Sequence, residues 1–216
     1  VVTRRQRQMC IRDRLITKRN MLIERAIEKS NQKRDRFKSR GQLSPRERLN
    51  AILDSDTFFL ELYNMANYLV EDTNHDTSIP GANLIAGIGY ISGVKCMIMI
   101  DDSGIKAGAA SEATIDKALG CLDIALKQKL PCVHLVESAG VDLPNYSVKL
   151  WSKFGSVFYK KAKLSAAGIP VIAILHGFST AGGAYQIGMS DYVIGVKGNG
   201  MAALAGSALL RAATGE

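Results

Sequence analysis

The sequence has few of the residues on which several classes of protein depend. Its 216 residues include four cysteines, three histidines and one tryptophan. The cysteines form no Cys-x-x-Cys pair, which argues against a zinc ribbon. Cys96 and Cys132 fall within apolar runs and are expected to be small buried residues, as is usual in a reducing compartment. No apolar run reaches the roughly 20 residues that cross a bilayer, so a transmembrane helix is not expected.

Most of the chain also lacks an excess of positive or negative charge. Residues 1–40 carry 14 Lys or Arg and 4 Asp or Glu, whereas residues 41–216 carry 14 and 16. The net charge of +8 therefore belongs to the N-terminal segment and is weak support for nucleic-acid binding. With 47% hydrophobic and 22% charged residues, the chain is typical of one medium-sized globular domain.

The basic N-terminus divides into two segments. Residues 1–14 are Arg-rich, as in a transit peptide, but we interpret them as a non-native leader and leave them out of the fold. Residues 15–40 are expected to form a basic helix over 15–38 that is mostly exposed. The alternative is a non-enzymatic basic module for acidic partners, which predicts salt-sensitive binding to nucleic acid.

Residues 41–216 form the expected folded domain. It opens with a helix that has Ser44 as N-cap, Pro45 in the first position and Glu47 in the third. Strands are expected at 57–62, 83–91, 94–100, 130–136, 171–175, 192–196 and 201–204, and further helices at 111–129, 151–167, from 181 and at 207–213. The helix at 151–167 is expected to present a basic face of Lys153, Lys160, Lys161 and Lys163. This alternation predicts an α/β domain with helices over the faces of a sheet.

The most specific chemistry lies in residues 170–191. The apolar run 171–175 leads to Ser179 and Thr180, both candidate N-caps, and then to a helix that opens with Ala181-Gly182-Gly183-Ala184. First-turn amides lack intrahelical partners, and glycine lets a ligand oxygen approach them, which suits negative charge on a carbonyl oxygen. The same glycines are equally compatible with tight helix–strand packing alone. A second small-residue loop, 138–141, follows the preceding strand, and the two loops would form one site if adjacent.

Five ordered segments resemble the carboxyltransferase (β) subunit of biotin-dependent acyl-CoA carboxylases, such as the propionyl-CoA and methylcrotonyl-CoA enzymes. They are GQLSPRERL from Gly41, GIGYISGV from Gly87, LVESAG from Leu135, STAGGAY from Ser179 and LRAATGE from Leu210. The resemblance covers about residues 15–216 and implies a crotonase-like fold, an α/β spiral of ββα units. Family members are roughly twice as long or more. It therefore also implies that residues 41–216 are an N-terminal domain, truncated before the C-terminal domain and inactive alone.

The resemblance implies transfer of a carboxyl group from carboxybiotin to the α-carbon of an acyl-CoA, with the thioester enolate held by the amides of Gly182 and Gly183. The other positions expected to bind substrate are Ser138, Ala139, Gly140, Lys106, Gly108, Ala181 and Tyr185. In the family the biotin itself acts as base. His176 is therefore interpreted as structural in preference to a general base, and His134 is also interpreted as structural.

The resemblance further implies a biotin carboxylase or biotin carboxyl carrier subunit as partner and a hexameric core of β subunits. No metal, nucleic acid or membrane partner is expected, and the bacterial cytoplasm is favoured over the mitochondrial matrix. Many members have Ser-Gly-Gly-Ala where this chain has Ser138-Ala139-Gly140-Val141, so the acyl group is not implied. Lys106 is expected either to touch a CoA phosphate or to be solvated. A related biotin-linked decarboxylase subunit is the alternative function.

Overall fold

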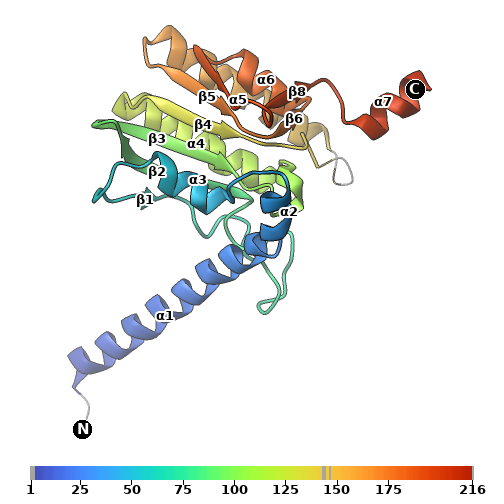
Figure 1. The fold of residues 1–216 in the computed structure, drawn as a ribbon. Coiled ribbons are helices and arrows are strands. Elements are labelled where there is room, and N and C mark those ends of the chain that lie inside the picture. Colours follow the sequence, from blue (N-terminus) through green and yellow to red (C-terminus); the bar gives the residue numbers. More distant parts are fainter. Residues whose placement is uncertain (1–2, 143–144, 146, 216) are drawn as a thin grey trace.

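A computed structural model describes residues 3–142, 145 and 147–215. The chain begins with three helices, α1 (Arg4–Asn31), α2 (Arg34–Ser39) and α3 (Pro45–Ile52). The capping box predicted at the start of α3 is confirmed, because the Ser44 amide donates to the Glu47 carboxylate at 2.8 Å. Figure 1 shows α1 and α7 extending away from the body of the molecule, which the elements from α2 to β8 form.

The body is built around a six-stranded sheet in the order β1-β2-β3-β4-β5-β7. Its strands are β1 (Leu60–Glu61), β2 (Leu84–Ile91), β3 (Val94–Asp101), β4 (Cys132–Val136), β5 (Val171–Leu175) and β7 (Tyr192–Gly195). β2 and β3 form the predicted antiparallel hairpin, whose turn residues Ser92 and Gly93 both have positive φ. From β3 to β7 all neighbours are parallel. Of the strand expected at 57–62, only the two residues of β1 adopt strand structure.

A second sheet and four more helices complete the fold. The parallel strands β6 (Phe178–Thr180) and β8 (Met201–Ala203) pair with each other. The helices are α4 (Glu112–Gln128), α5 (Val148–Ala166), α6 (Gly182–Gly188) and α7 (Ser207–Thr214), with the short 3₁₀ helix η1 at Lys106–Gly108. The unit strand–strand–helix thus recurs as β2-β3-α4, β5-β6-α6 and β7-β8-α7. In the last two units, the second strand leaves the main sheet and joins the small one.

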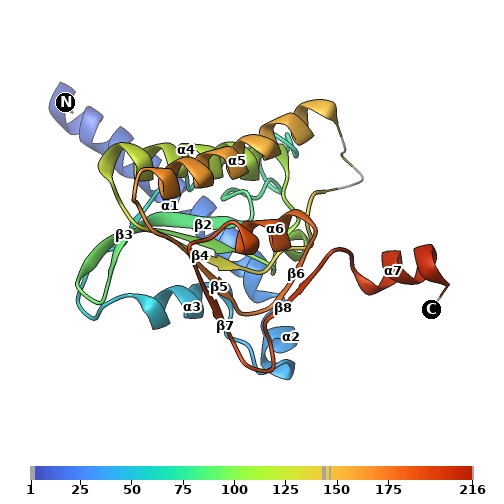
Figure 2. The ribbon, with the colours of Figure 1, turned by 90° about the horizontal axis from the view of Figure 1, so that it is seen from above.

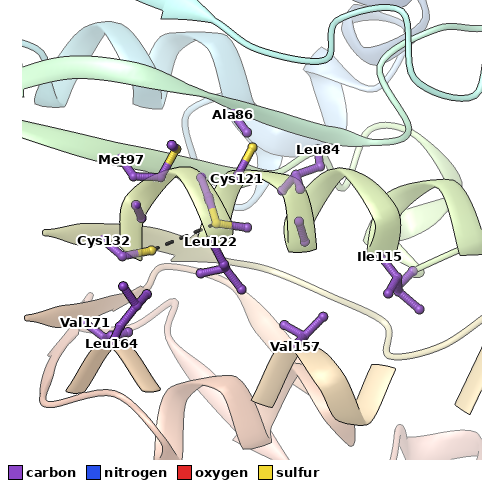
Figure 3. Close-up of a cluster of buried hydrophobic side chains, with 14 of the residues drawn as sticks. Leu84, Ala86, Met97, Ile115, Cys121, Leu122, Cys132, Val157, Leu164 and Val171 are labelled. Carbon is purple, nitrogen blue, oxygen red and sulfur yellow. Dashed lines mark hydrogen bonds between the residues drawn. The ribbon is translucent and has the colours of Figure 1, made fainter. Parts of the chain in front are cut away.

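The main sheet is covered on both faces because its strands alternate sides every residue. Met97 and Met99 of β3 belong to the core beneath α4 and α5, whereas Ile98 and Ile100 belong to the core beneath α3. Figure 2 shows α4 and α5 side by side on one face and α3 on the other. The larger core includes the predicted buried Cys132, which Figure 3 shows among the apolar side chains between the sheet and the two helices.

The N-terminal helix differs from its prediction. It begins at Arg4 instead of residue 15, and it ends at Asn31, after which α2 forms a separate helix. The C-terminal part of α1 is anchored, because Arg25 donates to two carbonyl groups of the loop at 75–78 and the Ser30 hydroxyl donates to Asp102 at 2.7 Å. The remainder is exposed, as predicted for this segment.

The predicted basic face of α5 is wrong at one position. Lys161 is fully buried, and its Nζ lies 3.1 Å from Nδ1 of His134. Its place in the sequence carried the signal, since it continues the buried stripe of Leu150, Phe154, Val157 and Leu164 along the helix. Among the described residues, no helix is both long enough and apolar enough to cross a membrane.

Candidate functional site

The site lies where two neighbouring parallel strands end. Val136 of β4 pairs with Leu175 of β5, so Glu137 and His176 are the first residues of two adjacent loops. We name these loops L4 (137–142) and L5 (176–181). The Thr180 amide donates to the Ser138 carbonyl at 2.9 Å. The two small-residue loops are therefore adjacent, which is the condition set above for a single shared site.

A third loop braces L4 from the side opposite L5. The 3₁₀ turn η1 has positive φ at Lys106, Ala107 and Gly108. Only glycine fits at position 108, since a Cβ there would overlap the Glu137 carbonyl oxygen. Gly108 is thus required for close packing of backbone on backbone, which supports the site indirectly.

Two central amides of L4 are occupied within the protein. The Ala139 amide donates to the Ala107 carbonyl at 3.2 Å, and the Gly140 amide donates to the Ser138 hydroxyl oxygen at 3.1 Å. The Ser138 hydroxyl in turn donates to the Gly108 carbonyl at 2.9 Å. Ser138, Ala139 and Gly140 were predicted to bind substrate, but the Ser138 hydroxyl and the amides of Ala139 and Gly140 already have partners, whereas the Ser138 amide has no acceptor among the described residues.

The amides at the start of α6 are different. Neither Gly182 nor Gly183 donates a hydrogen bond to any residue that the structure describes. The prediction of Ser179 or Thr180 as N-cap is wrong, because both lie in β6 and pair with β8. The N-cap is Ala181, which has no side-chain acceptor and adopts the sparsely populated φ 46°, ψ −114°. The turn at Ala181 is followed by three first-turn amides, those of Gly182, Gly183 and Ala184, that have no acceptor among the described residues.

The structure gives a steric reason why positions 182 and 183 are occupied by glycine. A Cβ on Gly182 would overlap the ring of Phe154 in α5, so this glycine allows tight packing of α6 on α5. A Cβ on Gly183 would lie 3.0 Å from the Cβ of Ser138, which is closer than side chains tolerate without a shift. The packing explanation weighed from the sequence is therefore correct for Gly182, although its amide remains free.

Two other predicted positions lie at the margin of the site. The Lys106 Nζ lies 2.7 Å from the Glu71 carboxylate and 3.4 Å from that of Asp142. Burial alone would lower the pKa of Lys106, but the hydrogen bonds and negative charges of Glu71 and Asp142 together outweigh it and raise the pKa. Lys106 is therefore paired with two carboxylates while its side chain stays 46% exposed. Tyr185 projects from α6 with its ring 5.6 Å from that of Phe158, and it is largely exposed.

A buried ion pair, to which the sequence gave no role, lies at the base of both loops. Arg48 of α3 donates from Nη1 to Glu137 Oε2 at 2.6 Å, and both side chains are 6% exposed. The same Nη1 lies 3.3 Å from His176 Nε2. A guanidinium can only donate, so Nε2 accepts and the imidazole is neutral with its proton on Nδ1. Burial, followed by the charge of Arg48, lowers the pKa of His176 to about 4.

The second buried histidine belongs to a separate chain of polar groups. His134 Nε2 lies 3.1 Å from Asp101 Oδ1, and Asp101 Oδ2 accepts from the Glu137 amide at 3.1 Å. Burial lowers the pKa values of both His134 and Lys161. Both histidines are enclosed by protein groups, which supports a structural role for each. Among the described residues, no cluster of His, Cys, Asp or Glu has the arrangement of a metal site.

A groove of about 210 Å³ opens beside the two loops. It is lined by Arg36, Phe37, Arg40, Ser103, Ala107, Glu137, Ala139 and Phe178. Arg36 and Arg40 are exposed, and neither guanidinium forms an ion pair with a described residue. The groove therefore brings two guanidinium groups without an ion-pair partner among the described residues next to residues of L4 and L5.

The site can now be compared with known proteins. A model of the carboxyl transferase domain family matches residues 36–216. The probable biotin-dependent acyl-coenzyme A carboxylase beta2 subunit of Mycobacterium tuberculosis is 44% identical over 84% of this chain and 33% of that protein. The mitochondrial methylcrotonoyl-CoA carboxylase beta chain of Arabidopsis thaliana is 43% identical over 84% of this chain and 30% of that protein.

A solved structure extends the comparison to the fold. The β subunit of P. aeruginosa geranyl-CoA carboxylase superposes with a TM-score of 0.79 at 42% identity, covering 87% of this chain and 35% of that one. The predicted crotonase-like α/β fold is thereby confirmed. The chain spans about a third of the length of the curated relatives it matches. With a family match over residues 36–216 and relatives above 40% identity, this chain belongs to the carboxyl transferase domain family.

Proposed function

We propose that this chain forms the acyl-CoA half of a biotin-dependent carboxyltransferase site. The observation that carries the proposal is the pair of free amides of Gly182 and Gly183 in a chain of the carboxyl transferase family. When the α-carbon of a thioester loses a proton, negative charge moves to the carbonyl oxygen. Two convergent N–H donors stabilise such an oxyanion more strongly than they stabilise the neutral thioester, which lowers the barrier.

The remaining residues of the site position these donors and their ligand. L4 supports α6 through the Thr180–Ser138 hydrogen bond and the contact of Ser138 with Gly183. Arg36 and Arg40 supply cations for the phosphates of CoA at the outer end of the groove. The neutral, enclosed His176 does not face a free reacting group, so we assign no acid or base to this chain. Carboxybiotin, delivered by a carrier subunit, supplies the carboxyl group.

The proposal extends to the assembled enzyme. Its partners are a biotin carboxylase or biotin carboxyl carrier subunit and further β subunits in an oligomeric core. The rest of the biotin site belongs to sequence that corresponds to the remaining two thirds of the relatives. We favour a branched or isoprenoid acyl group, because a methylcrotonoyl-CoA and a geranyl-CoA enzyme are both above 40% identical. The proposed compartment is the bacterial cytoplasm.

The decisive assay uses a subunit of full family length that contains this segment, combined with its biotin-bearing partner. We expect ATP- and biotin-dependent incorporation of labelled bicarbonate into an acyl-CoA, measured over a panel of straight, branched and isoprenoid acyl groups. Loss of label from a carboxylated acyl-CoA, without any incorporation, would assign the decarboxylase alternative. Absence of both activities across the panel would overturn the proposal.

A further inference from the structure

We propose that Arg48 is a positioning residue that holds the two loops of the site in register. This inference depends on the proposed function only in the experiment that measures enzyme activity. Arg48 lies on α3, outside the strands and loops that form the site. Its Nη1 alone contacts the first residue of each loop, Glu137 of L4 and His176 of L5.

The geometry requires that the two loop origins be close together. Both Glu137 and His176 follow paired residues at the ends of β4 and β5. A Cβ on Gly177 would overlap the Glu137 carboxylate, so L5 passes directly over that side chain. Ser103 also donates its hydroxyl to Glu137 Oε2 at 2.7 Å. One guanidinium nitrogen thus fixes the point from which both loops depart.

Arg48 is itself held by its surroundings. Its guanidinium carbon lies 5.4 Å from the centre of the Phe37 ring, which packs over it from α2. The side chain of Gln42 donates to the His176 carbonyl at 3.1 Å and closes the cluster from the α2–α3 connection. Arg48 Nη2, by contrast, has no hydrogen-bond partner among the described residues. The contribution of Arg48 to the link between the loop origins therefore runs through the single atom Nη1, beside the Thr180–Ser138 hydrogen bond farther along the loops.

The consequence for chemistry is geometric. A Cβ on Gly183 would lie 3.0 Å from the Cβ of Ser138, so the start of α6 packs closely on L4, and a shift of L4 relative to α6 moves the free amides. A displacement of about 1 Å in a reacting geometry lowers the rate by about 100-fold. Arg48 touches no reacting atom in this arrangement. Its loss should lower kcat with little change in the KM for acyl-CoA.

The chain offers a matched control on the same helix. Arg46 forms a two-pronged ion pair with Glu61 at 2.8 and 2.9 Å, partly buried, and it ties α3 to β1 instead of to the loops. Arg48→Met and Arg46→Met each remove one arginine from α3 and one ion pair. Only the Arg48→Met variant should affect L4 and L5.

The first test measures amide hydrogen exchange in the 216-residue chain, which requires no activity. Arg48→Met should accelerate exchange at residues 138–140 and 179–183 by about tenfold or more, whereas Arg46→Met should affect α3 and β1. The double variant Arg48→Met/Glu137→Gln removes the unpaired buried carboxylate that the single variant leaves. It should recover overall stability but keep fast exchange in both loops. Equal protection of both loops in wild type and double variant would overturn the proposal.

The second test measures turnover in the full-length carboxylase. The double variant should lower kcat by about 10- to 100-fold with KM for acyl-CoA within about twofold, and Arg48→Lys should recover part of the loss. Unchanged kcat in the double variant beside an active wild type would refute the positioning role. An inactive wild type would instead refute the proposed function, and the exchange experiment would still decide the role of Arg48.

Discussion

The loops that follow β4 and β5 begin as neighbours but differ in what their backbones leave free. In L4, the amides of Ala139 and Gly140 both have acceptors within the protein. Beyond L5, the amides of Gly182 and Gly183 have none among the described residues. The difference arises because L4 is braced by η1, whereas the chain after β6 reverses sharply at Ala181. L4 is therefore braced within the protein and the start of α6 keeps donors available, which on our proposal makes L4 the support and α6 the donor.

The largest effect is expected where the two loops touch. Gly183→Val would place a branched side chain against Ser138 and push α6 away from L4, since even a Cβ would lie only 3.0 Å from the Ser138 Cβ. We expect kcat to fall by about 100-fold. Gly188→Val is the matched control on the same helix, because its Cβ would meet nothing within 4 Å. Similar kcat values for the two variants would show that the contact does not position the donors.

A smaller effect is expected at the outer end of the groove. Like the amides of Gly182 and Gly183, Arg36 and Arg40 lack partners among the described residues. Each substitution by Ala should raise the KM for acyl-CoA by about tenfold, as expected for loss of one charge-assisted hydrogen bond. Arg34→Ala is the control, because Arg34 already pairs with Glu47 at 2.8 Å. If dephospho-CoA thioesters lose as much affinity as CoA thioesters, the bound phosphate is not the 3′-phosphate.

The supporting task of L4 can be tested at Ser138. Ser138→Ala leaves the Gly140 amide and the Gly108 carbonyl without their present partner. We expect the free energy of unfolding to fall by about 1–3 kcal/mol and kcat to fall only a few fold. Ser156→Ala, which removes an exposed hydroxyl from α5, should change stability by less than about 0.5 kcal/mol. A large loss of kcat without loss of stability would instead place the Ser138 hydroxyl in contact with substrate.

The smallest expected effect is on how the free energy of unfolding depends on pH. The pKa of His176 is lowered from 6.5 to about 4, first by burial and then by Arg48. Below pH 6.5 the unfolded chain binds a proton that the folded chain rejects, so stability is lost as the pH falls from about 6.5 to about 4. His176→Gln should reduce this slope in urea unfolding, whereas His75→Gln, at an exposed loop position, should retain it. An unchanged slope in His176→Gln would contradict the assignment.

The sequence predicted most of the architecture because its signals are local. Apolar runs located the central strands, Ser92-Gly93 located the hairpin, and the Ser44–Glu47 pattern located the start of α3. Predictions failed where a distant partner decided the outcome. Ser179 and Thr180 joined β8 instead of capping α6. The buried Lys161 is an exception, because its spacing along α5 already indicated the buried face. The leader and domain boundaries proposed for the termini stay predictions.

For the site, composition and motif order determined which two loops matter and which glycines open α6. Only the tertiary structure decided which amides remain free, because an amide is free only if no acceptor from another segment reaches it. The same reason explains why Arg48 escaped notice. It is separated from Glu137 by 89 residues and from His176 by 128, so no local pattern could reveal that one guanidinium holds both loops.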